Sequence, residues 1–425
     1  MSFPRYPKYK PSGVEWLGEV PEHWARKSLK HIANYQNGYP FKPDERGDVG
    51  LPILRIAQLT GDERPALFDG ELPDRVRVRT GDLLFSWSAN IDAFIWQGEG
   101  AWLNQHIFKV TPFAGTHRKF LFYVIKHVAP KLADFDAHGS TMRHIKKESL
   151  GEPVYAPLLP EQTAIAEFLD RETGKIDELV AEQRRLMELL KEKRQAVISH
   201  AVTKGLNPHA PMKPSGIEWL GDVPEHWTVK RFQRCVYVAE GQVDPTDGNF
   251  ANMSLIAPNH IESGTGRLLG LETSADQGAE SGKYFCKTGD VVYSKIRPAL
   301  RKVCIAPEDC LCSADMYPLR PHSGLTPTFL FWLILSEQFS ALAELESQRV
   351  AMPKINRESL KAVMLAVPPV EEQNTINAFL DSETAKFDTL TAEAQRAIDL
   401  LQERRTALIS AAVTGQIDVR PQIHN

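Results

Sequence analysis

The first 234 residues of this chain contain no cysteine. All five cysteines lie in the second half, at Cys235, Cys286, Cys304, Cys310 and Cys312. An odd number of cysteines, in a chain that does not start with a secretory signal, argues against a disulfide framework. The spacing also lacks the paired C-x-x-C ligands of a structural zinc site. We therefore expect reduced, structural cysteines and no bound metal.

Long hydrophobic runs are absent as well. No stretch reaches the roughly 18 consecutive apolar residues that a membrane-spanning helix needs. The chain begins with MSFPRYPKYKPSG, which has no apolar core of the kind found in secretory signals. These absences predict a cytoplasmic protein that makes no membrane contact.

The sequence lacks the motifs of the common catalytic sites. It contains no G-x-x-x-x-G-K-[ST] phosphate loop, no G-x-G-x-x-G at the start of a helix, no G-x-S-x-G and no H-E-x-x-H. The segment NPHA at 207–210 departs from the Asn-Pro-Pro-aromatic signature of amino-methyltransferases, because His209 replaces the second proline. We predict no catalytic residue, no cofactor and no metal site.

A large excess of positive charge is missing too. The net charge is −4, whereas most nucleic-acid-binding domains are strongly basic. Residues 1–155 contain 21 Lys and Arg against 18 Asp and Glu, and residues 206–365 contain 16 against 18. Any surface that binds DNA must therefore be local.

What the sequence does contain is a duplication. The segment KPSGVEWLGEVPEHW at 10–24 returns as KPSGIEWLGDVPEHW at 213–227, with only two differences. A second pair follows, EQTAIAEFLDRETGKIDELVAEQ at 161–183 and EQNTINAFLDSETAKFDTLTAEA at 372–394. The stretches between these segments do not match well. A duplicated framework with divergent inserts predicts one architecture that is built twice.

Each divergent insert shows mixed secondary-structure signals. Apolar runs at 51–59, 81–87 and 106–110 are bounded by Gly, Pro and Asp, which predicts strands. Residues 118–132 predict a helix that breaks near Pro130. In the second copy, the segments equivalent to 81–87, to this helix and to 142–150 are 289–295, 328–345 and 352–360.

Two long helices are predicted at 160–203 and 371–414. Their apolar residues recur at alternating steps of three and four, which is a heptad-like stripe. The stripe contains Ile165, Leu169, Ile176, Leu179, Leu186, Leu190 and Val197 in the first helix, and Ile376, Leu380, Phe387, Leu390, Ala397, Leu401 and Leu408 in the second. A helix of about 43 residues is roughly 65 Å long and needs a partner for its stripe.

We expect the two helices of one chain to form an antiparallel pair, in which Gln183, Lys193 and Arg404 fix the register. A domain-swapped or homodimeric coiled coil is the alternative. The fold class is then α+β, with two mixed α/β domains separated by this coiled-coil spacer. The expected boundaries are 1–155 and 206–365 for the domains, 156–205 for the first spacer helix, and 366–425 for the second spacer helix and the C-terminal tail.

This chain resembles the specificity subunit of type I restriction–modification systems over essentially its whole length. The resemblance rests on P-S-G-[VI]-E-W-L-G-x-V-P-x-H-W before each domain and on E-Q-x-x-I-x-x-F-L-D-x-E-T-x-K-x-D-x-L at the start of each long helix. The segments AVTKG at 201–205 and AVTGQ at 412–416 are also similar to that family. It implies two target-recognition domains and no catalysis by the subunit itself.

The resemblance also implies the partners. These are double-stranded DNA, two methyltransferase subunits docked on the helix pair, and restriction/translocase subunits that join this core. Each domain would read a short half-site, so the target would be asymmetric and divided by a gap whose length the helices set. The half-site centres would lie roughly 10 base pairs apart. The alternatives are a coiled-coil adaptor that binds proteins and a self-contained DNA-modifying enzyme with an unrecognised site.

Two segments of each domain carry the candidate DNA contacts. The segments 139–149 and 346–359 suit phosphate binding, and a solvated basic turn is the alternative. They offer Ser140, Thr141, Arg143, His144, Lys146 and Lys147 in the first domain, and Gln348, Arg349, Lys354 and Arg357 in the second.

The loops after GDLLFSW and GDVVYS are equivalent in position and divergent in content, as base-reading loops would be. These loops and a nearby strand offer Trp87, Asn90, Asn104, Gln105 and His106 in the first domain, and Lys295, Arg297 and Arg301 in the second. Buried tryptophan and satisfied polar groups are the alternative, because loops diverge anyway. The repeated Trp16, Trp24, Trp219 and Trp227 are expected to be framework, since two differently specific domains share them.

Overall fold

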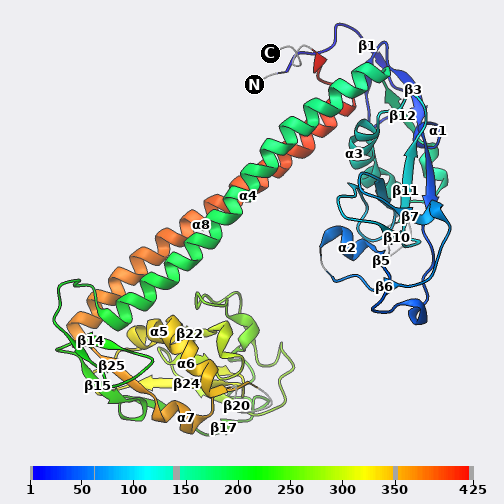
Figure 1. Cartoon of the computed structure of the whole chain (residues 1–425). Coiled ribbons are helices and arrows are strands. Elements are labelled where there is room, and N and C mark those ends of the chain that lie inside the picture. Colours follow the sequence, from blue (N-terminus) through cyan, green and yellow to red (C-terminus); the bar gives the residue numbers. More distant parts are fainter. Residues whose placement is uncertain (1–2, 62, 137–143, 348–352, 421–425) are drawn as a thin grey trace. The chain divides into compact units, whose positions relative to one another are not determined.

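The computed structural model describes residues 3–61, 63–136, 144–347 and 353–420. The chain forms two compact units. Unit 1 contains Met1–Gln183 and Arg396–Asn425, and unit 2 contains Arg184–Gln395. Each unit has its own large hydrophobic core, and each contains one part of both long helices (Figure 1).

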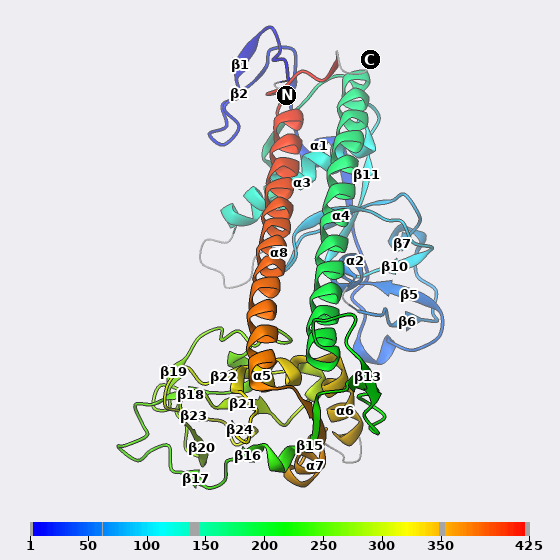
Figure 2. The same ribbon diagram turned by 90° about the vertical axis from the view of Figure 1, so that its left-hand side faces the viewer.

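The long helices are α4, Leu159–Lys204, and α8, Val370–Val413. In unit 1 the first part of α4 lies beside the last part of α8, and Arg405 donates to Asp177 at 2.8 Å (Figure 2). In unit 2 the last part of α4 lies beside the first part of α8, and Arg194 is 3.7 Å from Asp388. In these contacts the residue numbers increase along α4 as they decrease along α8. The pair is therefore antiparallel, as predicted, and both helices come from one chain.

The predicted stripe is confirmed in part. Its buried members are Ile165, Leu169, Ile176 and Leu190 in α4, and Ile376, Leu380 and Phe387 in α8. Val180 is 8% exposed, whereas the predicted Leu179 and Leu186 are 44% and 43% exposed. In α8, Ile398 is 4% exposed and the predicted Leu390 is 46% exposed. At four stripe positions, 179, 197, 397 and 408, the buried residue is the next one along the helix. Leu179, Leu186 and Leu390 therefore lie on the surface of the helix pair.

Two of the three residues predicted to fix the register are also off by one position. Lys193 and Arg404 are exposed, and their neighbours Arg194 and Arg405 make the interhelical ion pairs described above. Only Gln183 is half-buried where it was expected. The reason is geometric, because a shift of one residue turns a side chain by about 100° around the helix axis.

The mixed part of unit 1 contains two four-stranded sheets, in the orders β4-β11-β8-β9 and β6-β5-β10-β7. Helix α3, Arg118–Asp136, packs on the first sheet (Figure 1). The strands are β4 Ala33–Asn37, β5 Leu51–Leu54, β6 Leu67–Phe68, β7 Arg77–Val78, β8 Leu83–Ser86, β9 Asp92–Ile95, β10 Ala101–Leu103 and β11 Ile107–Pro112.

The corresponding part of unit 2 repeats this plan, with the orders β16-β24-β21-β22 and β17-β20-β23-β18-β19. Helix α5, Pro327–Leu335, packs on the first of these sheets. The strands are β16 Val236–Val238, β17 Gln242–Val243, β18 Ser254–Ile256, β19 Glu272–Thr273, β20 Lys283–Cys286, β21 Val291–Ser294, β22 Val303–Ile305, β23 Cys310–Cys312 and β24 Met316–Pro321. The α+β class with two similar mixed domains is confirmed.

Three predicted elements are corrected. The strand predicted at 51–59 ends at Leu54, because Ile56–Thr60 forms helix α2, whose first turn is capped by the Gln58 side chain. Helix α3 continues through Pro130, since the proline ring is exposed while Val128 and Leu132 are buried. Packing on both sides of the proline offsets the hydrogen bond that it removes.

The helix predicted at 328–345 is two helices, α5 and α6, with α6 at Glu337–Ser347 and a bend of 68° between them. The bend lies at Ser336, whose hydroxyl accepts from the N–H of Phe339 at 3.3 Å. Two side chains of α4 satisfy the broken ends. Gln195 donates to the Leu335 carbonyl at 2.9 Å, and the Ser199 hydroxyl accepts from the Glu337 N–H at 2.9 Å.

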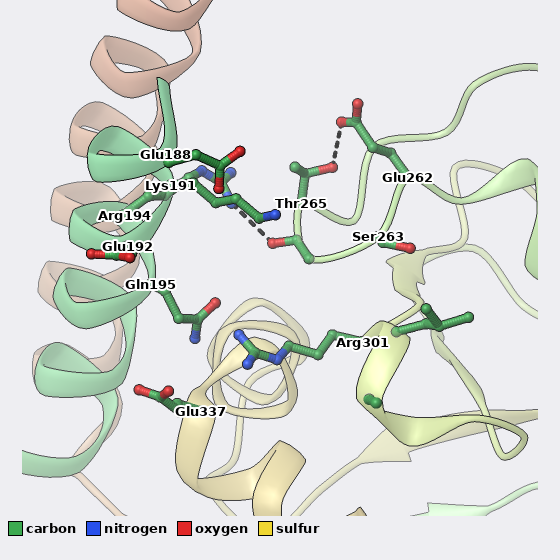
Figure 3. Close-up of a pocket in the computed structure, with 13 residues that line it drawn as sticks. Glu188, Lys191, Glu192, Arg194, Gln195, Glu262, Ser263, Thr265, Arg301 and Glu337 are labelled. Carbon is green, nitrogen blue, oxygen red and sulfur yellow. Dashed lines mark hydrogen bonds between the residues drawn. The ribbon is translucent and has the colours of Figure 1, made fainter. Parts of the chain in front are cut away.

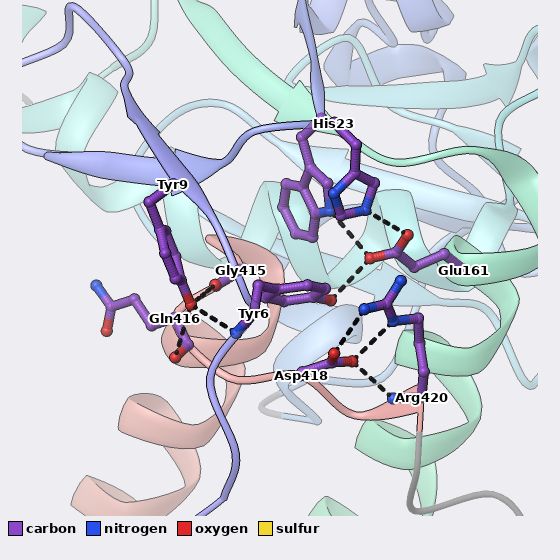
Figure 4. A network of polar contacts seen from close by, with 9 residues as sticks. Tyr6, Tyr9, His23, Glu161, Gly415, Gln416, Asp418 and Arg420 are labelled. Carbon is purple, nitrogen blue, oxygen red and sulfur yellow. Dashed lines mark hydrogen bonds and ion pairs between the residues drawn. The ribbon is translucent and has the colours of Figure 1, made fainter.

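The duplicated motif anchors each mixed domain to the start of a long helix, and Figure 4 shows this contact in unit 1. The indole N–H of Trp24 donates to Glu161 at 3.0 Å, and the His23 imidazole is 2.8 Å from the same carboxylate. The equivalent contacts in unit 2, at 3.1 and 2.6 Å, join Trp227 and His226 to Glu372. Trp24 and Trp227 are fully buried, as expected of framework residues, whereas Trp16 is 37% exposed and Trp219 is half-buried.

Short strand pairs complete this framework in both units. They are β1 Tyr9–Pro11 with β2 Glu19–Pro21, β3 Ala25–Ser28 with β12 Pro153–Ala156, β13 Met212–Pro214 with β14 Asp222–Pro224, and β15 Thr228–Arg231 with β25 Met364–Val367. In each unit the last of these strands leads directly into a long helix.

Both ends of the described chain meet in unit 1, and we call this contact the terminal clasp (residues 3–10 with 414–420; Figure 4). The Tyr9 hydroxyl donates to the Gly415 carbonyl at 3.0 Å, and the Asp418 N–H donates to the Pro4 carbonyl at 2.8 Å. In unit 2 the equivalent helix end continues through the backbone into β13. A noncovalent contact in one unit thus takes the place of a peptide connection in the other.

All five cysteines are buried free thiols, and four of them pack in one apolar cluster of unit 2. Burial raises the pKa of Cys304 to about 12. Within residues 3–61, 63–136, 144–347 and 353–420, no three or more His, Cys, Asp or Glu are grouped to hold a metal ion. No single helix in these ranges has the length and apolar content to cross a membrane, although the bent pair α5 and α6 reaches both when taken together.

Candidate nucleic-acid interface

In unit 1 three segments that are distant in sequence meet at the end of β8, and we call this place junction 1 (residues 86–90, 104–106 and 144–145). The Ile145 N–H donates to the Trp87 carbonyl at 2.8 Å, and Ser88 forms a bridge with His144. The Trp87 N–H donates to the carbonyl of His106 at 3.3 Å. The two segments proposed from sequence to contact DNA are therefore adjacent.

Unit 2 builds the same frame at the end of β21, which we call junction 2 (residues 294–298, 313–315 and 353–355). The Ile355 N–H donates to the Lys295 carbonyl at 3.0 Å, and Ile296 forms a bridge with Lys354. The Lys295 N–H donates to the carbonyl of Asp315 at 2.9 Å. These three backbone contacts have the same partners by position in both junctions, whereas the side chains differ.

Junction 1 carries mostly neutral side chains. The Trp87 ring lies 5.4 Å from the ring of His106, so a half-buried indole supports an exposed imidazole. Gln105 is exposed, and its amide is 3.3 Å from the imidazole of His106. Asn104 is buried and its side chain accepts from the His106 N–H at 3.3 Å, so it shapes the turn.

The rest of the first-domain candidates lie around junction 1. Lys146 and Lys147 are exposed, and His144 is half-buried. The N–H of Lys146 donates to Asp136 at 2.9 Å, which fixes the backbone of this basic segment. Ser140, Thr141 and Arg143, together with Gln348 and Arg349 of the second domain, lie outside the described residues.

Two cations at or near junction 2, Lys295 and Arg357, are engaged by the protein itself. The ammonium of Lys295 donates to the Ala314 carbonyl at 2.6 Å. The Arg357 guanidinium lies over the ring of Tyr284 at 5.3 Å and over the ring of Tyr317 at 4.7 Å. It also donates to two backbone carbonyls of residues 238–239. Burial raises the pKa of Tyr317, and the guanidinium opposes that rise.

Two other cations, Arg297 and Lys354, are exposed. Neither side chain makes a hydrogen bond or an ion pair with the part of the chain that the structure describes. Of the four described second-domain candidates at or near junction 2, these two are available to a ligand.

Asn90 and Arg301 lie on the helix-facing sides of their loops. Arg301 extends toward Gln195 of α4 and Glu337 of α6 in a cavity of about 720 Å³ (Figure 3). Its Nε is buried without a partner in the described structure. Asn90 lines an equivalent cavity of about 1020 Å³ beside α8 in unit 1. These two candidates therefore line the cavities that lie between each loop and a long helix.

Electrostatics in the unit 1 cavity also favour a structural role. Burial and the ammonium of Lys131 lower the pKa of His127 to about 4, so this imidazole is neutral at pH 7. Lys126 pairs with Asp92 at 2.7 Å. The cavity therefore holds matched charges rather than a concentrated positive field.

The sequence did not identify two residues of the junctions. Ala89 occupies the loop tip of junction 1, with a left-handed backbone. Asp315 is exposed at junction 2, in the place that His106 takes in junction 1. Neither has a basic or aromatic side chain, and only the matching backbone contacts of the two junctions single them out.

Comparison with known proteins gives a consistent result. Residues 21–186 and 245–399 match the family described as type I restriction modification DNA specificity domain. The chain is 28% identical over 398 residues to the type I restriction enzyme EcoDI specificity subunit of Escherichia coli, which covers 88% of each protein. It is 25% identical over 431 residues to the EcoBI specificity subunit of Escherichia coli, covering 97% of this chain and 90% of that one.

A solved structure is similar in fold. It comes from work on complex assembly and conformational transition of the type I R-M system. Its TM-score with this chain is 0.66 at 17% identity, and the match covers 93% of this chain and 98% of that chain.

Proposed function

Because the chain belongs to the type I restriction modification DNA specificity family, we propose that each unit reads one half of an asymmetric, bipartite target in double-stranded DNA. The protein is a specificity subunit, a non-catalytic component that recognises DNA within a restriction–modification complex. The adaptor and the self-contained enzyme weighed from sequence are thereby set aside.

One observation supports a bipartite and asymmetric target. The two junctions share a backbone frame and differ in nearly every side chain that they expose. Sequence is read by side chains at base edges, while phosphate contacts fix position. Two equal frames with unequal side chains suit two different half-sites on the same duplex. Lys146, Lys147 and Lys354 would hold phosphates beside them.

The test is to reconstitute the chain with methyltransferase subunits and to sequence the DNA that the complex methylates. We expect one target with two unlike half-sites and a gap of fixed length. A palindromic target, or methylation without sequence preference, would contradict the proposal. Exchanging residues 206–365 for those of a relative should change one half-site and leave the other intact.

We also propose that two methyltransferase subunits dock on the helix pair, one on each unit. Exposed leucines of the two long helices support this. Leu179 and Leu400 are 44% and 65% exposed in unit 1, and their repeat equivalents Leu390 and Leu189 are 46% and 52% exposed in unit 2. Each unit thus offers the same apolar pair, one residue from each helix, which suits two copies of one partner. Restriction/translocase subunits would join this core.

Native mass spectrometry tests the docking proposal. The variant Leu179→Ser with Leu400→Ser should lose one methyltransferase subunit and keep the other. A matched control is Leu269→Ser, because this residue of unit 2 is 61% exposed and lies outside both long helices. Retention of two subunits by the double variant would refute this docking surface.

A further inference from the structure

The loop tip has the same unusual backbone in both junctions but a different residue. Ala89 has a φ of 57° and Arg297 has a φ of 46°. Left-handed backbone is uncommon outside glycine and persists only where the surrounding structure holds it. Here the residue just before each tip, Ser88 or Ile296, is bridged to the segment that precedes the next element. The frame fixes this backbone, and the side chain is left to vary.

The Arg297 side chain has no structural role in the described part of the protein. It is exposed, and within the described residues only its backbone is engaged: the N–H donates to the Pro353 carbonyl at 3.1 Å, and the carbonyl accepts from the Leu300 N–H at 2.9 Å. The nearby Lys295 and Arg357 donate to backbone carbonyls, and Arg301 extends toward α4. A strained position that holds an unengaged arginine is expected at a binding site and is hard to explain by folding alone.

We propose that the position of Ala89 and Arg297 determines sequence specificity, and that Arg297 recognises a guanine in the half-site read by unit 2. This inference rests on the proposed function. The planar guanidinium donates two parallel N–H groups to O6 and N7 of guanine, the commonest specific contact in the major groove. The methyl group of Ala89 offers only an apolar contact, which suits the C5-methyl of thymine.

The other exposed residues of the junctions also suit a G·C pair at junction 2 and an A·T pair at junction 1. Asp315 shares junction 2 with Arg297 and is exposed, and a carboxylate accepts from the N4 amine of cytosine. In junction 1 His106 takes the place of Asp315, and its exposed neighbour Gln105 can pair with N6 and N7 of adenine. Junction 2 therefore favours a G·C pair, and junction 1 favours an A·T pair.

The experiment uses the complex reconstituted with methyltransferase subunits and a pool of randomised DNA duplexes. Bound duplexes are sequenced for the wild type and for Arg297→Ala, which copies the residue found at the first loop tip. We expect a guanine in the second half-site, and a roughly ten- to hundred-fold loss of preference for it in the variant. The first half-site should be unchanged. The reciprocal variant Ala89→Arg should alter the first half-site alone.

Two controls keep the result interpretable. Arg234→Ala removes an exposed arginine that precedes β16, beside the end of β24 that lies farthest from junction 2, and it should leave both half-sites intact. Arg297→Gly removes the side chain where glycine tolerates the backbone, so it replaces the alanine variant if that one misfolds.

Three outcomes decide the matter. If the second half-site contains no guanine, or if Arg297→Ala leaves every base preference unchanged, the inference is overturned. A uniform loss of affinity, with the salt slope reduced by about one, would make Arg297 a phosphate contact and would also overturn it. If the wild-type complex selects no sequence at all, the proposed function fails instead.

Discussion

Glu161 binds the indole of Trp24, the imidazole of His23 and the hydroxyl of Tyr6, the last at 2.8 Å. Among the described residues, its repeat equivalent Glu372 binds a tryptophan and a histidine and no third donor. Replacement of Glu372 by alanine leaves a fully buried indole N–H without an acceptor, so we expect unit 2 to lose about 1–3 kcal/mol of unfolding free energy. Replacement of Glu161 by alanine should lower the unfolding free energy of unit 1 by more, because the Tyr6 hydroxyl also loses its acceptor. Hydrogen exchange in each unit measures both effects.

Glu371→Ala is the control for this pair, because Glu371 is exposed one residue away from the anchored carboxylate. It should stay within about 0.5 kcal/mol of the wild type. Equal losses for the two anchored glutamates would show that the Tyr6 contact adds nothing to unit 1.

At the residue scale, the sequence predicted which segments form the candidate interface. It did not predict which of their cations are engaged by the protein and which are free to bind a ligand. Lys295, Arg297 and Arg357 are three cations in two neighbouring segments, and nothing local distinguishes them. The difference arises from Tyr284 and Tyr317, which reach Arg357 only through the folded sheets. Which of these residues contact DNA stays a prediction.

At the scale of elements, the seam of the helix pair can be tested directly. Val180→Ser places a polar group in a seam position that is 8% exposed, and we expect a loss of about 2 kcal/mol in unfolding free energy. Leu179→Ser changes an adjacent surface position and should cost less than about 0.5 kcal/mol in the free chain. Thermal unfolding compares the two. A larger loss of unfolding free energy for Leu179→Ser than for Val180→Ser would show that Leu179 lies in the seam, as the sequence predicted.

The sequence predicted the existence and limits of the long helices well, because their pattern persists over more than ten turns. It failed where a distant residue decides the outcome. Gln195 and Ser199 of α4 supply the hydrogen bonds that let α5 and α6 separate at Ser336. No local pattern in 328–345 contains that information, so a single helix was the natural expectation.

At the scale of the whole molecule, the proposed spacer makes a numerical prediction. Insertion of seven residues after Gln183 of α4 and after Ala394 of α8 preserves the heptad phase and lengthens each helix by about 10.5 Å. At roughly 3.4 Å per base pair, the gap in the target should grow by about three base pairs, with both half-sites retained. Methylated-DNA sequencing reads the gap. Altered half-sites would refute the proposal that the mixed domains read the bases while the helix pair sets only the gap.

The terminal clasp allows another test on the intact chain. Removal of residues 414–425 takes away the partners of Tyr9 and Pro4, so backbone exchange in unit 1 should accelerate while unit 2 is unaffected. Removal of residues 421–425 alone is the control, because the clasp contacts lie before them. Equal protection of unit 1 in both truncations would mean that the clasp does not stabilise it.

The discontinuity of unit 1 has a consequence for biosynthesis. Residues 184–395 are contiguous, so unit 2 is complete when its last residue leaves the ribosome. Unit 1 needs Arg396–Asn425, and at about 5–20 residues per second its first 183 residues wait roughly 10–40 s for that segment. During this interval the apolar side chains that α8 later covers are exposed to chaperones and proteases. The half of the protein that is translated first is therefore the half that folds last.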